Sequence, residues 1–227
     1  NDTTGETTGW QDSADYDIGD DVPFQLTATL ANNIESYKTY SLKFNDTLSE
    51  GLDYNNDAVI KLGDKDVTDR FTPSYDATAK TLTFTCDDIK AFGAKNSDKI
   101  VVEYTAKLNE NAVIGAAGNP NTVYLDFSNN PNNGGEGDRG KTPEDIVIVF
   151  TYKVVINKVD ENGKALDGAK FTLYKKIKNE KDKEIEAVIS GDKNNIFTFN
   201  GLDDGDYVLK ETEVPDGYNK ADDIEFT

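Results

Sequence analysis

The chain has 227 residues, enough for one large domain or two modest ones that each bury a core. Its 43 acidic and 24 basic residues give a formal charge of −19, which argues against nucleic acid or an anionic membrane surface as a partner. The lack of His and the single Cys exclude His-based triads, His-ligated zinc, CxxC redox chemistry and intrachain disulfides, so no metal or cofactor is predicted.

The sequence contains no targeting or membrane-spanning segment. No apolar run approaches the roughly 18 to 20 residues that cross a bilayer, and the N-terminus has neither the basic nor the apolar region of a secretion signal. We therefore expect no membrane insertion. The chain begins with Asn1 and contains no Met, which favours a processed or excised piece of a longer protein.

Alternation of apolar and polar residues predicts strands in the first two thirds of the chain. The candidate strands are Val22–Leu30, Tyr40–Asp46, Thr81–Cys86, Ile100–Lys107, Asn121–Asn129 and Ile146–Phe150. A short helical turn is predicted at Asp87–Phe92. The Asn- and Gly-rich stretch Ser128–Gly140 is too polar to pack and is predicted to be an exposed loop.

A second group of strands follows without a linker. Its members are Tyr152–Val159, Lys170–Lys175, Ile185–Ile189, Ile196–Phe199 and Tyr207–Glu211. Short strands at this spacing, separated by turn residues, are typical of β-sandwiches. We predict an all-β chain of two tandem immunoglobulin-like β-sandwiches, residues 1–151 and 152–227, which form a semi-rigid rod.

In the second group, two charged residues fall in phase with apolar residues. Lys158 shares a strand face with Val154 and Ile156, and Glu211 shares one with Leu209. Burial would lower the pKa of a lysine and raise that of a glutamate until both are neutral. Such a pair would be reactive toward a neighbouring amide.

The first group contains a similar pattern. Asp46 ends an apolar stripe that starts at Tyr40, and Asn121 and Asn129 lie at the two ends of a stripe that includes Val123. The alternative is that these polar residues reach solvent at strand ends or form ordinary turns.

The last third of the chain resembles a known family. The stretches Leu166-Asp-Gly-Ala-Lys-Phe-Thr-Leu173 and Tyr207-Val-Leu-Lys-Glu211-Thr-Glu-Val-Pro-Asp-Gly-Tyr218 resemble the B-type domain of the collagen-adhesin (Cna) family, in which the second motif is called the E-box. These domains occur in pilins and surface adhesins of Gram-positive bacteria. The resemblance covers most of residues 152–227.

The preceding region is similar to the isopeptide-forming middle domain of fimbrial shaft subunits, which is Cna A-like. The likeness is carried by Asp46-Thr-Leu-Ser-Glu-Gly-Leu52, Tyr104-Thr-Ala-Lys-Leu-Asn109 and Asn121-Thr-Val-Tyr-Leu-Asp-Phe-Ser-Asn129-Asn-Pro131. It spans most of residues 1–150. The order of the two domains is that of a sortase-assembled pilin.

The resemblance implies that each domain forms an internal isopeptide bond between a Lys amine and an Asn carboxamide, with release of ammonia and help from a nearby acid. In the second domain, Lys158 matches the reactive lysine and Glu211 the E-box acid. The acceptor Asn of this domain is expected on a strand that follows Thr227.

For the first domain, the resemblance assigns the assisting acid to Asp46 and the acceptor to Asn129, with Asn121 as the alternative on the same face. The lysine of this domain is expected upstream of Asn1. Lys38, which is in phase with Tyr40, is a substitute candidate.

A covalent tie between distant strands limits the entropy of the unfolded chain, much as a disulfide does. Because the reaction occurs once per molecule, no enzyme activity is expected. We expect a structural subunit of a covalently assembled, extracellular, cell-wall-attached pilus, joined to neighbouring pilin subunits by sortase and supporting adhesion.

Two other functions remain open. The chain fits the stalk of a cell-wall-anchored adhesin that binds a host surface ligand near Asn121–Gly140. A carbohydrate-active enzyme would need paired catalytic carboxylates, and the acidic residues form no recognisable pair.

Three further features have structural explanations. Cys86 is expected to be a buried thiol, and Trp10 a packing residue. The acidic stretches Asp12–Asp21 and Asp203–Asp206 lack the spacing of a calcium loop, so a solvated acidic surface is expected there.

Overall fold

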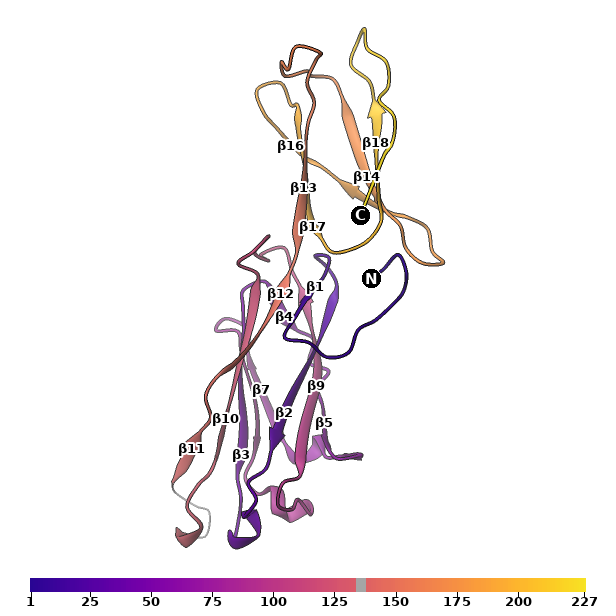
Figure 1. Ribbon diagram of the computed structural model, residues 1–227. Coiled ribbons are helices and arrows are strands. Elements are labelled where there is room, and N and C mark those ends of the chain that lie inside the picture. The colour runs from indigo at the N-terminus through magenta and orange to yellow at the C-terminus, as the bar shows by residue number, and fades with distance from the viewer. Residues whose placement is uncertain (134–137) are drawn as a thin grey trace.

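A computed structural model describes residues 1–133 and 138–227, and it consists of two β-sandwiches stacked end to end (Figure 1). The all-β prediction is confirmed, because the helical elements among the described residues are short 3₁₀ turns. The strands are β1 (Ser13–Asp15), β2 (Asp21–Thr29), β3 (Leu42–Leu48), β4 (Leu52–Tyr54), β5 (Val59–Leu62), β6 (Lys65–Asp66), β7 (Thr72–Asp76), β8 (Thr81–Cys86), β9 (Lys99–Leu108), β10 (Asn119–Ser128), β11 (Arg139–Lys141), β12 (Asp145–Phe150), β13 (Tyr152–Asn157), β14 (Lys170–Lys175), β15 (Lys183–Glu186), β16 (Val188–Ser190), β17 (Ile196–Leu202), β18 (Tyr207–Glu213) and β19 (Ile224–Phe226). The 3₁₀ turns are η1 (Ile34–Ser36), η2 (Thr68–Arg70), η3 (Ile89–Phe92) and η4 (Pro131–Asn133).

The first sandwich packs two sheets against each other. One has the strand order β1-β12-β10-β3-β8-β7, with β11 on β10, and the other has the order β2-β9-β5-β6, with β4 on β9. Strand alternation explains the core, since β9 buries Ile100, Val102 and Tyr104 and turns the residues between them outward. The ring of Tyr104 stacks on that of Phe24, with 5.3 Å between centroids.

The register of β3 and β10 brings the two stripes of the sequence together. Asp46 lies opposite Val123, and Asn121 lies opposite Leu48. Residues two apart share a face of the sheet, so Asp46 and Asn121 are diagonal neighbours on the core side.

The second sandwich packs the sheet β13-β17-β16 against the sheet β15-β14-β18-β19. Its core includes Leu173, Phe197, Phe199 and Leu209. The prediction of one strand at Ile185–Ile189 is wrong, because the chain passes from one sheet to the other within this stretch. β15 pairs with β14 in one sheet, whereas β16 pairs with β17 in the other.

The loop predicted at Ser128–Gly140 is partly wrong. Ser128 is buried as the last residue of β10, where its hydroxyl lies 3.0 Å from that of Ser41. The chain then forms η4 and returns through β11, which pairs with β10. Residues 134–137 of the predicted loop lie outside the described residues.

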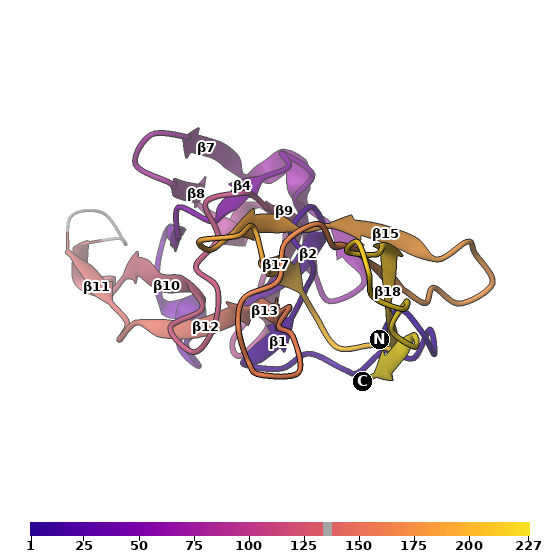
Figure 2. The same cartoon turned by 90° about the horizontal axis from the view of Figure 1, so that it is seen from above.

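Only Thr151 separates β12 from β13, and it is completely buried. The turn that follows β1 contacts the second sandwich through the N–H of Ile18, which donates to the carbonyl of Gly201 over 3.1 Å. Gly201 has φ +74, and a Cβ there would lie 2.8 Å from Ile18. The contact therefore requires glycine. Figure 2 shows the two termini next to each other at this junction.

Candidate functional site

The lysine and glutamate singled out in the second sandwich form an ion pair. Lys158 directly follows β13, and its Nζ lies 2.9 Å from Oε1 of Glu211 on β18. The Glu211 side chain is fully shielded from solvent and the Lys158 side chain is 17% exposed. The other carboxylate oxygen, Oε2, accepts the N–H of Ala221 over 2.7 Å. The Lys158 ammonium also lies 5.8 Å from the ring centre of Phe171.

The ionisation of Glu211 differs from the expectation based on burial alone. Burial acts to raise the pKa of this carboxyl, but the N–H of Ala221 and the charge of Lys158 together hold its pKa below the ordinary value. Glu211 is thus a carboxylate at neutral pH. It is positioned to accept a proton from the amine before that amine acts as a nucleophile.

Three buried side chains meet across the core of the first sandwich. The Tyr104 hydroxyl, from the opposite sheet, donates to Oδ2 of Asp46 over 2.5 Å. Nδ2 of Asn121 donates to the Tyr104 hydroxyl over 2.8 Å and lies 3.5 Å from Oδ2 of Asp46. Asp46 is 1% exposed and Asn121 is 2% exposed. The remaining oxygen of each side chain, Oδ1, has no hydrogen-bond partner.

Burial dominates the electrostatics of this cluster. It raises the pKa of Asp46 to about 6, although the hydrogen bonds from Tyr104 and Asn121 act in the opposite direction. Burial, together with the nearby Asp46 charge, raises the pKa of Tyr104 well above its ordinary value. Asp46 can therefore exist as a neutral acid or as a carboxylate within one unit of neutral pH.

The raised pKa predicts that Asp46 makes stability depend on pH. Because the folded pKa is about 6 and the unfolded pKa about 3.9, folding penalises the carboxylate, and stability falls as pH rises from about 4 to 6 and then stays constant. The full difference is about 3 kcal/mol. Asp46→Asn should remove it, so denaturant unfolding should show the variant gaining about 3 kcal/mol relative to wild type between pH 4 and pH 8.

The matched control is Asp64→Asn, because Asp64 is exposed. Its stability relative to wild type should stay constant over the same range. A difference between Asp46→Asn and wild type that does not change with pH would contradict the assignment.

Of the two acceptor candidates, only Asn121 joins the cluster. Asn129 is exposed, just beyond the end of β10, and its N–H donates to the carbonyl of Asp138. The geometry therefore favours Asn121 over Asn129. Lys38 is also exposed, and no lysine of the described chain contacts Asp46 or Asn121.

Tyr104 belongs to the cluster although no role for it was predicted from the sequence, where it forms part of one of the family-like motifs. Its position in the alternation of β9 marks it as a core residue, since its neighbours two apart, Val102 and Ala106, are buried. A tyrosine at such a position needs a hydrogen-bond partner for its hydroxyl. That requirement is the sequence signal from which a polar group in the core could have been predicted.

A second buried lysine lies at the junction of the sandwiches. Lys175, at the end of β14, is 0% exposed, and its ammonium contacts Asp203 and lies 2.8 Å from Oδ2 of Asp2 and 3.2 Å from Oδ2 of Asp17. Lys183 lies 2.7 Å from the same oxygen of Asp17. We call Lys175 with these three aspartates the junction cluster.

The pKa values in the junction cluster follow from burial and pairing. Burial alone would lower the pKa of Lys175, but its three carboxylates raise it above the ordinary value. Burial raises the pKa of Asp203 to about 7, with the charge of Lys175 acting against it.

Two expectations from the sequence differ from the structure. The acidic stretch Asp12–Asp21 is not entirely a solvated surface, since Asp17 is buried against the lysines of the second sandwich. Trp10 is not packed in a core but is 55% exposed. Asp17 is buried because it contacts lysines that are distant in the sequence, whereas no distant segment covers Trp10 among the described residues.

Family comparisons match both parts of the chain. Residues 18–131, half of the chain, match the Gram-positive pilin backbone subunit 2, Cna-B-like domain, and residues 152–227 match the SpaA prealbumin-like fold domain. The trypsin-resistant surface T6 protein of Streptococcus pyogenes serotype M6 is 26% identical over 226 residues, covering 89% of this chain. The chain spans 40% of the length of that relative.

Solved structures of pilins have the same fold. The 35 kDa C-terminal fragment of the major pilin GBS80 of Streptococcus agalactiae matches with a TM-score of 0.72 at 22% identity, covering 95% of this chain and 87% of the fragment. Domains D2 and D3 of the major pilin SpaD of Corynebacterium diphtheriae match with a TM-score of 0.62 at 25% identity, covering 94% and 85%. The described residues include no helix of the length and apolarity needed to cross a bilayer. The chain belongs to the family of Gram-positive pilin backbone subunits.

Proposed function

We propose that this chain is part of a structural subunit of a pilus backbone on a Gram-positive cell surface, and that an isopeptide bond through Lys158 closes its second sandwich. The proposal divides the chain into two domains at Thr151, where β12 passes into β13. Its single strongest support is the contact between the Lys158 amine and the fully buried Glu211 carboxylate. Such a pair is costly to bury unless the charges are matched, and it places a base directly on the amine.

The proposed reaction needs no cofactor. The Lys158 ammonium gives a proton to Glu211, and the neutral amine attacks the carboxamide carbon of an Asn supplied from outside these residues. The bond between that carbon and the amide nitrogen breaks. The leaving nitrogen takes up both protons that the lysine nitrogen loses, the first of them returned by Glu211, and departs as an ammonium ion. One amide bond is lost and one is formed.

For the first sandwich, we propose Asp46 as the assisting acid and Asn121 as the acceptor. The support is their adjacency through the Tyr104 hydroxyl and the raised pKa of Asp46, which allows a protonated acid to polarise the Asn121 amide. The proposal replaces Asn129, because its exposed side chain lies outside the cluster.

The proposed role in the pilus is mechanical. An isopeptide bond carries load covalently and does not depend on redox conditions, which suits a chain with one buried Cys. Neighbouring pilin subunits, joined by sortase at the cell wall, would be its partners. The self-reaction happens once, so the protein is proposed not to be an enzyme.

The test is the intact mass of the longer protein in which the second sandwich has its acceptor. The unchanged sequence should weigh one ammonia less for this domain, and peptide mapping should join Lys158 to an Asn. Glu211→Ala should restore the full mass and lower resistance to heat and protease, because the buried base is lost.

Lys210→Ala is the matched control. Lys210 precedes Glu211 on β18 but points to the other face, where it is 43% exposed and lies 3.7 Å from Asp223. The control should keep the mass deficit. Equal deficits in both variants, or none in the unchanged protein, would refute the proposed bond.

A further inference from the structure

The first five residues of the chain lie on the second sandwich, although they precede the first. The carbonyl of Asp2 accepts the N–H of Lys178 over 2.9 Å. The hydroxyl of Thr3 accepts the N–H of Asp206, also over 2.9 Å. We call residues 1–5 the strap, because they connect the start of the first sandwich to the loops of the second.

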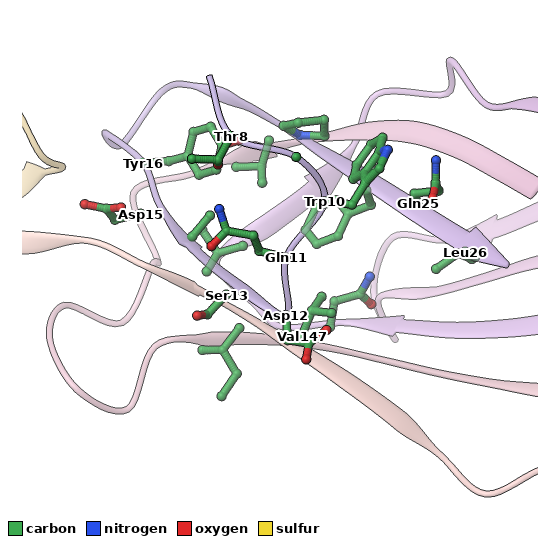
Figure 3. Close-up of a pocket in the computed structure, with 18 of the residues that line it drawn as sticks. Thr8, Trp10, Gln11, Asp12, Ser13, Asp15, Tyr16, Gln25, Leu26 and Val147 are labelled. Carbon is green, nitrogen blue, oxygen red and sulfur yellow. The ribbon is translucent and has the colours of Figure 1, made fainter. Parts of the chain in front are cut away.

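A weakly held connector joins the strap to β1. Residues 6–12 contain no strand or helix, and residues 7–11 make no hydrogen bond to any residue that the structure describes. Figure 3 shows this connector next to β2, with Trp10, Gln25 and Leu26 around one pocket. Among the first twelve residues, only Asp2 and Thr3 are partly buried. Lifting the strap would therefore break its contacts with the second sandwich without disturbing a strand of either sandwich.

The strap brings a carboxylate to a place that already holds more carboxylates than ammonium groups. Oδ2 of Asp2 lies 2.8 Å from Nζ of Lys175 in the junction cluster. With the strap closed, four carboxylates face two ammonium groups, namely Asp2, Asp17, Asp20 and Asp203 against Lys175 and Lys183. Oxygens of the first three carboxylates lie within 4.8 Å of one another. Like charges at this distance repel each other, and protonation of one carboxylate relieves the repulsion.

Asp203 is the carboxylate in this group that is best placed to hold the proton. Only 7% of its side chain is exposed, and burial raises its pKa to about 7. The charges of Asp17 and Asp2 act in the same direction, whereas Lys175 acts against them. Release of the strap would remove the charge of Asp2 and admit water, and both changes lower the pKa of Asp203. The closed strap therefore binds this proton more tightly than the open strap, so acid favours closure.

Two tyrosines complete the surroundings of Asp203. Tyr16 lies in the turn after β1, and the hydroxyl of Tyr207 on β18 donates to the carbonyl of Asp203 over 2.9 Å. Burial raises the pKa of both tyrosines above the ordinary value. Both stay neutral between pH 6 and pH 8, so they do not contribute to a pH response in this range.

We propose that the strap is a proton-controlled fastening between the two sandwiches, which closes when Asp203 is protonated and opens when Asp203 is ionised. The closed strap stiffens the junction, because it ties the connector before β1 to the second sandwich. The open strap leaves the contact of Ile18 with Gly201 and the single residue Thr151 to hold the sandwiches together. The device involves no bond formation and does not depend on the proposed isopeptide chemistry.

Two backbone amides report closure directly, because their acceptors belong to the strap. They are the amides of Lys178 and Asp206, and their hydrogen-exchange protection can be followed by NMR on the 227-residue chain. After correction for the intrinsic pH dependence of exchange, protection should be about tenfold lower at pH 8 than at pH 6. This ratio follows when a group has a pKa of about 7 in the closed state and a pKa well below 6 in the open state. The amide of Gly163, which donates to Asp160 in a separate turn, should keep its protection.

Three variants separate the proton from the other contacts of the strap. Asp203→Asn removes the titrating group, so the protection of the Lys178 amide should become equal at pH 6 and pH 8. Thr3→Val removes only the hydroxyl contact, so the strap should open more at both pH values and keep the tenfold ratio. Asp64→Asn, on an exposed turn of the first sandwich, should behave as the unchanged chain. If Asp203→Asn does not fold, the unchanged chain and Thr3→Val still decide the question.

Four results would overturn the proposal. Equal protection of Lys178 at pH 6 and pH 8 in the unchanged chain would show that no proton controls the strap, and stronger protection at pH 8 would show that ion pairing outweighs the repulsion. A tenfold change that persists in Asp203→Asn would place the proton elsewhere. An equal fall in the protection of Gly163 would show that the whole second sandwich opens rather than the strap.

Discussion

Lys175→Met is expected to destabilise the protein by about 3–5 kcal/mol, the cost of breaking a buried ion pair by removing one partner. Methionine fills a similar volume but leaves the buried carboxylates of Asp17 and Asp203 without the ammonium between them. Lys183 still contacts Asp17, so the largest uncompensated charge should fall on Asp203. The measurement is the free energy of unfolding from denaturant titration at pH 8, which is above the pKa of about 7 of Asp203.

Lys176→Met is the control, because it changes the adjacent residue and breaks only an exposed pair with Glu225 at 3.3 Å. Its cost should be under about 1 kcal/mol. Adding Asp17→Asn and Asp203→Asn to Lys175→Met should recover part of the loss, since amides are cheaper to bury than carboxylates. Equal costs for the two lysine variants would show that the junction cluster contributes no more than a surface pair.

Placing a lysine at position 12 is expected to create a covalent bond in the first sandwich. β1 pairs with β12 in parallel, and continuing this register by one residue places Asp12 beside Val147, which itself pairs with Asn121. Asp12 and Asn121 are therefore separated by two strand spacings, or about 10 Å between Cα atoms. Asp12→Lys then directs an amine toward the Asn121 carboxamide, beside the acid Asp46. The expected product lacks one ammonia. It should be about 4–5 kcal/mol more stable, because the bond closes a loop of roughly 100 residues.

Trp10→Lys tests the same bond to Asn121 from a position two residues earlier, which alternation places on the same face as Asp12. Ser13→Lys is the negative control, because neighbouring residues of a strand point to opposite faces. Combining Asp12→Lys with Asn121→Ala or with Asp46→Ala should restore the full mass. A full mass for both Asp12→Lys and Trp10→Lys would argue that Asn121 is not a competent acceptor.

Strand periodicity predicted much of the candidate site. The two-residue repeat placed Asp46 and Glu211 in phase with apolar residues, and both side chains are buried. The same repeat places Asn121 and Asn129 on one face and cannot distinguish them as acceptors, because periodicity does not predict the residue at which a strand ends. β10 ends at Ser128, so Asn129 leaves the sheet.

Strand periodicity could not predict contacts between segments that are far apart in the sequence. The burial of Asp17 depends on lysines more than 150 residues away, and nothing local marks it. The division of the predicted strand at residues 185–189 also depends on long-range pairing, since its first part pairs with β14 and its second part with β17. The ionisation of Glu211 also depends on the N–H of Ala221, which follows it by ten residues in a stretch without regular secondary structure that no periodicity marks.

The junction has a consequence for folding. Asp17 belongs to the first sandwich, yet its countercharges come from the second, and Ile18 fills the space that Gly201 leaves open. Neither sandwich presents a complete surface by itself, so partial unfolding of one would expose a buried charge on the other. The two should therefore melt in one cooperative transition, and the half synthesised first should reach its full stability only after the other has folded onto it.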